Sequence, residues 1–359
     1  MIALKILTLY KIQHPVLHPK NSYKLKSLVF ILLLLLLFIV NISLGSVDIP
    51  LSSVFNSLSG NGGSKETWNY IIINYRLPKA ITAILVGSGL AISGLLMQTL
   101  FRNPLAGPYV LGISSGASLG VALLILGSSI IGGSFSLLGQ SQLLISMAAS
   151  AGSFLVLFAV MIVSRQVKNT MSILIIGLMF SSLTSAVISV LAYFSSAENL
   201  QQYMFWGFGS LGNLTWSEVL IFTCIYLLAG ILILPVVKSL NSLLLGENYA
   251  KSIGINIKRT KNLVLIATSL LTGVITAFAG PIAFIGLAAP HMTKLILNTS
   301  EHKLIIPAAA LLGANIMLIS DTVAQLPNSE FTLPINAITT MFGAPIVIWL
   351  LLRKKKMVL

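Results

Sequence analysis

The chain has 359 residues, of which 56% are hydrophobic and 8% are charged; its formal net charge is +14 and its mean hydropathy is +0.96. A soluble domain carries roughly 25% charged residues. This composition therefore excludes a soluble protein and indicates an all-α polytopic membrane protein. The single cysteine, Cys224, excludes a disulfide within the chain and a cysteine-based metal site.

Ten apolar segments follow one another along the chain, and a spanning helix takes about 20 such residues. We predict ten transmembrane helices, at about residues 29–44, 77–100, 109–126, 143–163, 171–191, 219–237, 263–278, 282–297, 305–323 and 333–352. For the first segment a signal peptide cleaved near residues 43–45 is the alternative. A short amphipathic helix is expected near residues 51–58. The aromatic stretch at 193–216 suits an interfacial belt.

The basic residues fall mainly on one side of this layout. Nineteen of the 22 lysines and arginines lie in segments on the same side, and Lys65, Arg76 and Lys79 remain on the other. Cytoplasmic loops carry such an excess, so both termini are predicted in the cytoplasm. Residues 1–26 form a basic N-terminal segment, 27–353 a single transmembrane domain and 354–359 a basic tail. This topology accounts for the net charge without nucleic acid.

A polar break separates two small-residue segments at 87–120. Pro104 and Pro108 force the chain to turn there. Irregular backbone near lipid persists only where protein or a water-filled cavity covers it. Gly112, Gly116 and Gly120 then recur every fourth residue, which predicts a bare groove that another helix can approach closely. Ordinary helix packing is the alternative role for these glycines.

The chain contains few chemically reactive groups. It has no Gly-Lys dipeptide, hence no Walker phosphate loop, no HExxH motif and no carboxylate pair. Asp321 sits clearly inside a span, which makes it a functional candidate. Because it lies near the outer end of its span, we expect a hydrogen bond to a neighbouring helix end. Ion-coupled carriers usually place ionisable groups at the midplane, so the energy for transport is expected from a partner. A secondary carrier acting alone is the alternative, and no catalytic constellation supports a membrane enzyme.

The long polar segment at 238–262 is where such a partner would dock. Within it, Leu245, Tyr249, Ala250 and Ile253 fall close together on one face of a short amphipathic helix. Gly254 is predicted to end that helix. A helix lying on the bilayer surface is the alternative.

Several motifs, taken together, resemble one family. They stand at 76–78 (RLP), 94–98 (GLLMQ), 103–108 (NPLAGP), 111–117 (LGISSGA), 280–287 (GPIAFIGL) and 290–291 (PH), with Gly246, Ala250 and Gly254, and with Asp321, Glu330, Pro334 and 343–345 (GAP) near the end. In this order and spacing the chain resembles the permease subunit of bacterial ATP-binding-cassette importers for iron–siderophores, haem and vitamin B12. The resemblance covers about residues 28–353.

The resemblance implies a fold and a set of partners. A permease of this kind has ten helices, sits in the bacterial cytoplasmic membrane and pairs with a second copy or a homologous permease around a central path. Two cytoplasmic ATPase subunits, which bind the ATP, would dock on a coupling segment at about 243–256 through Gly246, Glu247, Ala250 and Gly254. An extracytoplasmic binding protein would deliver the chelate. No cofactor or metal is implied on this chain.

The resemblance also implies roles for individual residues. Asn103 and Leu105 correspond to a cytoplasmic gate in the break, and Thr170 with Met171 correspond to a second gate loop, although turn chemistry alone is the alternative. Pro290 and His291 correspond to a structural cap at the cytoplasmic end of the eighth span.

The resemblance assigns Arg76 and Lys79 to the outer surface. They match exposed cations that pair with carboxylates of the binding protein, and membrane anchoring is the alternative. Two positions depart from the family pattern. Gln325 replaces an arginine, which puts part of this docking site in doubt, and Asn336 replaces a glycine, which indicates a different local loop.

Overall fold

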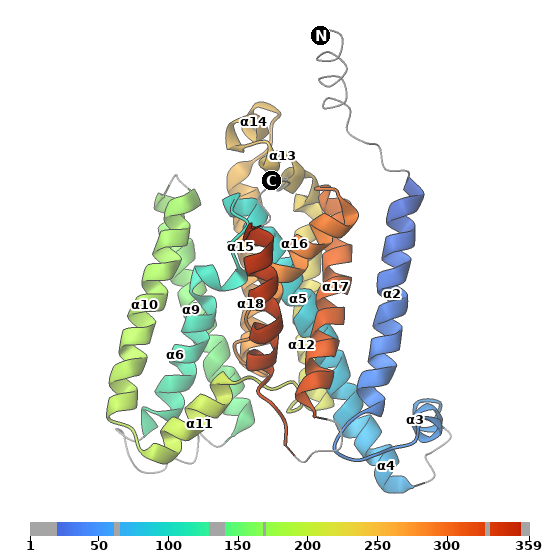
Figure 1. Cartoon of the computed structure of the whole chain (residues 1–359). Helices are drawn as coiled ribbons and strands as arrows, with labels where there is room; N and C mark the ends of the chain where they lie inside the picture. Colours follow the sequence, from blue (N-terminus) through green and yellow to red (C-terminus); the bar gives the residue numbers. More distant parts are fainter. Residues whose placement is uncertain (1–19, 61–64, 129–140, 168–169, 327–330, 353–359) are drawn as a thin grey trace.

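The computed structural model describes residues 20–60, 65–128, 141–167, 170–326 and 331–352, and this part of the chain is helical with no strand. Its long helices run side by side in a bundle (Figure 1). Seven helical segments are long and apolar enough to cross a membrane. They comprise all or most of α2 (Lys20–Ser43), α5 (Leu77–Phe101), α9 (Gln142–Gln166), α10 (Thr170–Tyr193), α12 (Trp216–Ile233), α15 (Ile257–Ala279) and α17 (His302–Ala324). The predicted all-α polytopic fold is confirmed.

Three shorter apolar helices occupy the other predicted spans: α6 (Ile113–Ile125), α16 (Ile285–Leu297) and α18 (Ile335–Leu352). α6 and α16 begin later than predicted because the residue before each helix, Gly112 or Phe284, has a positive φ. Each has 13 residues and is about 20 Å long. That is short of the roughly 30 Å hydrocarbon core, so backbone outside the α-helices completes both spans.

The two breaks in the α-helices, 102–112 and 280–284, meet in the interior, and the first contains a short 3-10 helix, η2 (Pro108–Leu111). The Tyr109 hydroxyl donates a hydrogen bond to the carbonyl of Ile282. A β-carbon on Gly286 would lie 2.8 Å from Cδ of Pro108. Protein therefore covers the irregular backbone at both breaks, as membrane depth requires.

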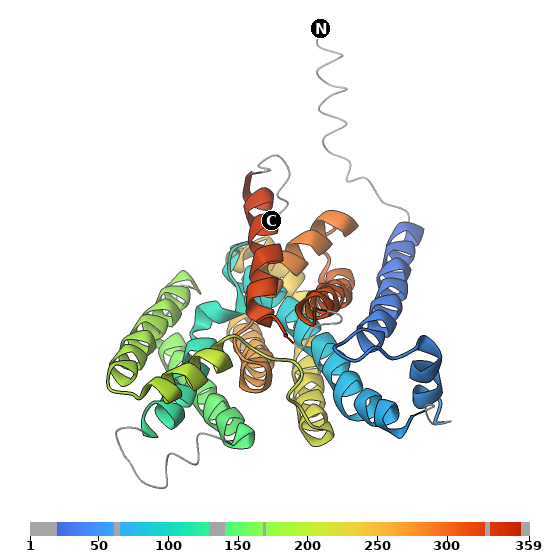
Figure 2. The same ribbon diagram turned by 60° about the horizontal axis from the view of Figure 1, so that its bottom comes forward.

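α5 is the central helix, and most of its side chains are buried. Figure 2 shows it between α2 at one edge of the bundle and α10 at the other. Two glycines let its neighbours approach. A β-carbon on Gly94 would overlap the carbonyl of Gly286 in α16, and one on Gly87 would overlap that of Gly313 in α17. In lipid the hydrophobic effect does not drive helices together, and the close packing that small residues allow takes its place.

The predicted glycine groove on α6 is real but shorter than expected. Gly116 and Gly120 face α9, where a β-carbon on Gly116 would lie 2.5 Å from the carbonyl of Gly152. Gly112 does not belong to this contact, because it precedes the helix with φ +76° and lies against Gly177 of α10. Two glycines, not three, therefore form the groove.

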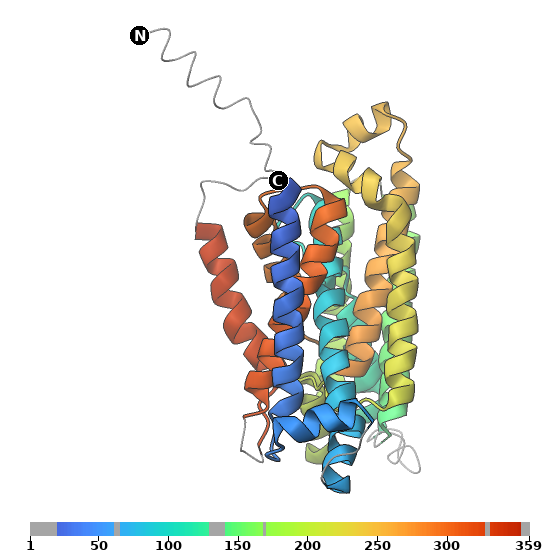
Figure 3. The same cartoon turned by 90° about the vertical axis from the view of Figure 1, so that its right-hand side faces the viewer.

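Short helices mark the two ends of the bundle (Figures 1 and 3). α3 (Leu51–Leu58), as predicted, α4 (Glu66–Ile71) and α11 (Ala197–Gly207) lie at one end, here called the α11 end. A π-helical turn, η1 (Ile72–Arg76), joins α4 to α5. α13 (Val237–Leu244) and α14 (Glu247–Ser252) project from the opposite end, here called the α14 end. α11 lies within the aromatic stretch predicted as an interfacial belt, and the Ser196 side chain caps it by accepting from the Asn199 amide.

Candidate functional site

The predicted coupling segment forms two short helices with glycines at the second helix's ends. Gly246 precedes α14 with φ +114°, and Gly254 follows it with φ +85°. The Gly254 amide donates to the Lys251 carbonyl and the Ile255 amide to the Ala250 carbonyl, both at 3.0 Å. These two bonds form a Schellman motif, which needs a left-handed residue and so favours glycine. The helix end predicted at Gly254 is confirmed.

The side chains of this segment do not share one face as predicted. Ala250 is fully buried, whereas Leu245, Tyr249 and Ile253 are 65%, 48% and 52% exposed. The prediction took sequence spacing as one continuous helix, but Gly246 turns the chain between α13 and α14. The α14 end therefore presents three large apolar side chains outward, beside exposed Lys251.

The predicted gate lies where α5 ends. Arg102 adopts the left-handed conformation at φ +48°, and the amide of Asn103 closes the helix end on the Gln98 carbonyl at 3.1 Å. The Asn103 side chain accepts from the Leu105 amide at 2.9 Å. Leu105 is 46% exposed. The break thus holds Asn103 in a tight turn and leaves Leu105 outside the packed core.

The second predicted gate residues begin α10. Met171 is 45% exposed, and the side chain of Thr170 lies outside the described residues. Further along α10, Gly177 packs against the backbone of Val110 and Leu111, in the last part of the break. α10 therefore contacts the segment that follows the first gate, and the gate role of these residues stays a prediction.

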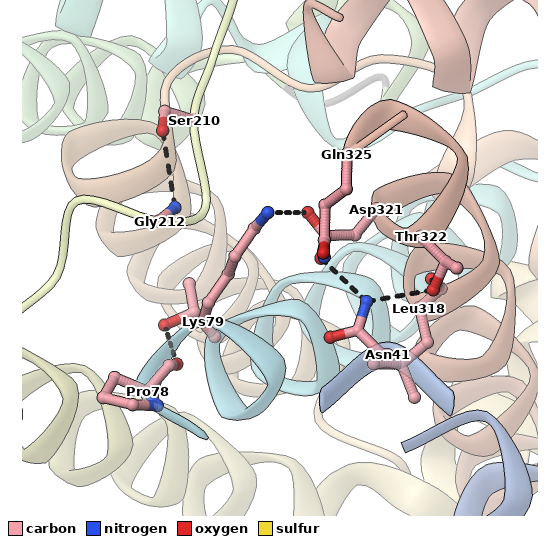
Figure 4. A network of polar contacts seen from close by, with 10 residues as sticks. Asn41, Pro78, Lys79, Ser210, Gly212, Leu318, Asp321, Thr322 and Gln325 are labelled. Atoms are coloured by element: carbon pink, nitrogen blue, oxygen red, sulfur yellow. Dashed lines mark hydrogen bonds and ion pairs between the residues drawn. The ribbon is translucent and has the colours of Figure 1, made fainter. Parts of the chain in front are cut away.

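A buried polar network lies near the α11 end (Figure 4). Asp321 of α17 is 2% exposed. It forms an ion pair with Lys79 at 3.2 Å, accepts from Asn41 of α2 at 2.8 Å and accepts from Gln325 at 2.7 Å. Asn41 also donates to the Thr322 hydroxyl at 3.0 Å. The expected contact of Asp321 with a neighbouring helix end is present, and the network joins α2, α5 and α17.

Arg76 does not stand exposed at the outer surface as expected. It is 8% exposed, and its guanidinium donates to the carbonyls of Ile42 and Ser43 at 2.9 and 2.8 Å and to that of Val47. The guanidinium also lies over Gly45, where a β-carbon would come within 2.8 Å. Carbonyls at the end of α2 have no partner within the helix, so an arginine from the next span caps them.

The two family departures have clear structural roles. Gln325 is 8% exposed, and its amide serves the buried Asp321 carboxylate rather than the surface. Asn336 lies at the start of α18. Its side-chain oxygen accepts from the Ala283 amide at 3.1 Å, and its backbone amide donates to the Phe208 carbonyl at 3.2 Å. The side-chain bond to Ala283 therefore joins α18 to the second break, and glycine could not make this bond.

Pro290 and His291 are not a helix cap. They lie inside α16, which continues to Leu297 and ends at left-handed Asn298. Proline has no amide to donate to the carbonyl four residues earlier, which belongs to Gly286. That is the carbonyl that Gly94 of α5 approaches. Pro290 therefore shapes the α5–α16 contact, and His291 is partly buried beside it.

A second buried network, at the α14 end, has no counterpart in the sequence analysis. His302, the first residue of α17, is 1% exposed and contacts Thr99 of α5 and Asn241 of α13 at 2.8 and 2.7 Å. Nothing local marks these residues, since they are far apart in the chain. No group of three metal-ligating side chains occurs in the described part of the chain.

Comparisons with known proteins agree with this architecture. The chain is 36% identical over 325 residues to the hemin transport system permease protein HmuU of Yersinia pestis, covering 90% of this chain and 95% of that protein. It is 36% identical over 286 residues to the vitamin B12 import system permease protein BtuC of Salmonella typhi, covering 78% and 83%. A solved structure of a metal-chelate type ABC transporter in an inward-facing conformation matches 91% of this chain and 98% of its own, with 29% identity and a TM-score of 0.78.

The family comparison covers nearly the whole bundle. Residues 33–353 match the FecCD transport family, from within α2 to just beyond α18. This range includes the two breaks, the coupling segment and both buried networks. The resemblance read from the motifs is confirmed, and the chain belongs to the FecCD transport family.

Proposed function

We propose that this chain is the membrane permease of an ATP-driven importer that moves a metal chelate into the bacterial cytoplasm. A second permease copy or a homologous permease would complete the path, and two ATPase subunits would bind and hydrolyse the ATP. A binding protein outside the membrane would deliver the substrate. The named relatives transport haem and vitamin B12, and an iron–siderophore is the substrate we propose first.

The observation that carries this proposal is the projecting coupling segment. It has a short helix, α14, between two glycines of positive φ, Gly246 and Gly254. It also has three exposed apolar side chains, Leu245, Tyr249 and Ile253. Large exposed apolar side chains beside a polar rim mark a protein contact surface. Described basic residues, among them Lys251, Lys258 and Arg259, gather at the same end. Their excess supports a cytoplasmic position for this surface.

The arrangement of charge disfavours a carrier acting alone. Ion-coupled carriers place titratable groups near the bilayer midplane. Asp321, in contrast, lies within four residues of the end of α17 and is already paired with Lys79. The energy source is therefore proposed to be the partner ATPase.

Docking of the binding protein on Arg76 and Lys79 stays a prediction. Both side chains would have to leave their present partners, the α2 carbonyls and Asp321, to meet carboxylates of the binding protein.

Uptake in a deletion strain tests the function. A strain lacking this chain is supplied with labelled ferric siderophores, haem or vitamin B12, with and without a plasmid copy. Restored ATP-dependent uptake of one compound identifies the substrate. A variant with Tyr249→Asp and Ile253→Asp should reach the membrane yet fail to bind the ATPase and to restore uptake. A matched control, Phe55→Asp with Leu58→Asp on α3, changes two exposed apolar residues at the opposite end and should still bind the ATPase. Uptake that persists without the ATPase subunits would refute the proposal.

A further inference from the structure

Three elements meet at His302, at the α14 end of the bundle. His302 is the first residue of α17, Thr99 lies two residues before the end of α5, and Asn241 lies in the middle of α13. Thr99 and His302 are each 1% exposed. The imidazole thus lies between the helix that leads into the predicted gate and the helix that leads into the coupling segment.

The hydrogen positions follow from the partners. The Asn241 side-chain oxygen accepts from the backbone amide of His302 at 2.9 Å and lies 2.7 Å from Nδ1 of the same residue. An oxygen acceptor requires a proton on Nδ1. In the neutral ring Nε2 is then an acceptor, and the Thr99 hydroxyl, 2.8 Å away, donates to it.

The Thr99 hydroxyl has a second acceptor within its own helix. The carbonyl of Leu95 lies 2.9 Å from Thr99 Oγ1. A hydroxyl has one proton, so it donates to either Nε2 or the Leu95 carbonyl at a time. When the bond between α5 and His302 breaks, the buried hydroxyl therefore keeps an acceptor, and only Nε2 loses its partner.

A second contact between the same regions lies nearer the surface. Arg102, which ends α5, places its guanidinium 3.6 Å from the point where a β-carbon on Gly246 would stand. Gly246 begins α14. α5 therefore meets the coupling segment at its end through Arg102 and meets the preceding α13 through His302.

We propose that His302 is a positioning residue that transmits movement of α13 and α14 to the gate end of α5, through Asn241 on one side and Thr99 on the other. This inference rests on the proposed function, since it requires an ATPase on α14. Movement of α13 carries Asn241, which holds the backbone and the ring of His302 together. The ring then draws or releases Thr99, four residues before Asn103.

The test measures gate movement rather than uptake, so that no substrate is needed. Leu105→Cys is introduced with Cys224→Ser, and the permease–ATPase complex is assembled in lipid nanodiscs. The rate at which a maleimide labels position 105 is compared with and without ATP and vanadate. Thr99→Val removes the donor to His302. Thr82→Val is the matched control, because Thr82 is a fully buried threonine of the same helix whose hydroxyl donates to the Pro78 carbonyl at 2.8 Å.

We expect Thr99→Val, and not the control, to lose most of the ATP-dependent change in labelling at position 105. Thr99→Val should reduce the ATP-dependent change in labelling by about fivefold, the effect of one net hydrogen bond, while ATP hydrolysis and complex assembly persist. Thr82→Val should leave the change intact. Asn241→Ala should add little to Thr99→Val, because both act through the same ring. In the parent protein, His302→Gln should retain more of the response than His302→Leu.

Two outcomes separate the inference from the function it rests on. If the parent complex responds to ATP and Thr99→Val responds as Thr82→Val does, His302 does not transmit movement, although the proposed function stands. If the parent complex assembles and hydrolyses ATP with no change at position 105, the gate assignment of Leu105 and the role of His302 are both overturned, whereas the proposed function is overturned only by uptake that persists without the ATPase subunits.

Discussion

The ion pair between Lys79 and Asp321 allows an asymmetric prediction. The Lys79 side chain is 21% exposed, whereas that of Asp321 is 3% exposed. A lysine without its carboxylate can turn its ammonium group toward water. The shorter, buried side chain of Asp321 cannot turn its carboxylate toward water in this way. Lys79→Met should therefore destabilise the protein more than Asp321→Asn.

The magnitude follows from the contacts that remain. Removing one partner of a buried pair typically costs about 3–5 kcal/mol. Two amide donors, Asn41 and Gln325, still serve the Asp321 carboxylate after Lys79→Met. Bonds to a charged group contribute about 1.5–3 kcal/mol each, so we expect the lower part of that range, about 3 kcal/mol. Asp321→Asn should cost about 1 kcal/mol, because only hydrogen bonds are exchanged.

The double variant isolates the pair itself. Lys79→Met with Asp321→Asn leaves no buried charge, so its loss should fall about 1–2 kcal/mol below the sum of the single losses. The assay is equilibrium unfolding of the detergent-solubilised protein in a denaturing detergent titration, followed by tryptophan fluorescence. Lys303→Met removes an exposed lysine from the same helix as Asp321 and should stay within about 0.5 kcal/mol of the parent. If Lys79→Met unfolds like Lys303→Met, or less readily than Asp321→Asn, the reasoning is wrong.

Three further predictions concern topology, packing and coupling. With Cys224 replaced, cysteines at exposed Ser59 and Ser252 should react with an impermeant thiol reagent from opposite sides of intact cells; equal labelling from outside would contradict the ten-span layout. Gly116→Leu should prevent α6 from reaching α9 and lower the unfolding midpoint sharply, whereas the same change at Gly207, where an added β-carbon meets nothing within 4 Å, should have little effect. Gly254→Val places a side chain at φ +85° with nothing within 4 Å, so the substitution should cost only about 1 kcal/mol of local strain. It should weaken ATPase binding in a pull-down while membrane insertion stays normal. Undiminished binding would show that the helix end does not shape the contact with the ATPase.

The sequence predicted the parts of the fold that local chemistry determines. Each predicted span contains an apolar helix, because hydrocarbon contact selects for continuous apolar residues. Pro104 and Pro108 marked the first break, and Gly254 marked a left-handed helix end. In each case the cause lies within a few residues of its effect.

The same reasoning failed where apolar residues do not form helix. The segment 282–297 reads as one continuous span, yet its first residues lie outside any helix and φ at Phe284 is positive. Hydrophobicity reports burial, and here the interior of the protein buries non-helical backbone as well. α11 was missed for the converse reason, since its composition is too polar and aromatic for a span.

The buried networks could not be predicted, because their partners lie far apart in the chain. Asn41 and Asp321 are separated by 280 residues, and Thr99 and His302 by 203. The predicted topology and the family resemblance placed Arg76 and Lys79 together on an outer surface. The structure shows that neighbouring helices supply carbonyls and a carboxylate to these two cations. Such a site depends on which helices lie next to one another, and a local sequence pattern does not contain this information.

The meeting of the two breaks has a consequence for how the chain is made. Residues 102–112 leave the ribosome long before 280–286, which later cover them through Ile282 and Gly286. At about 5–20 residues per second, the wait is roughly 10–35 s. During this interval the first break has polar backbone at membrane depth without its final cover. A nascent chain that stops before α16 therefore lacks the contacts of Ile282 and Gly286 with the first break, so this part of the fold can form only after the second break has been synthesised.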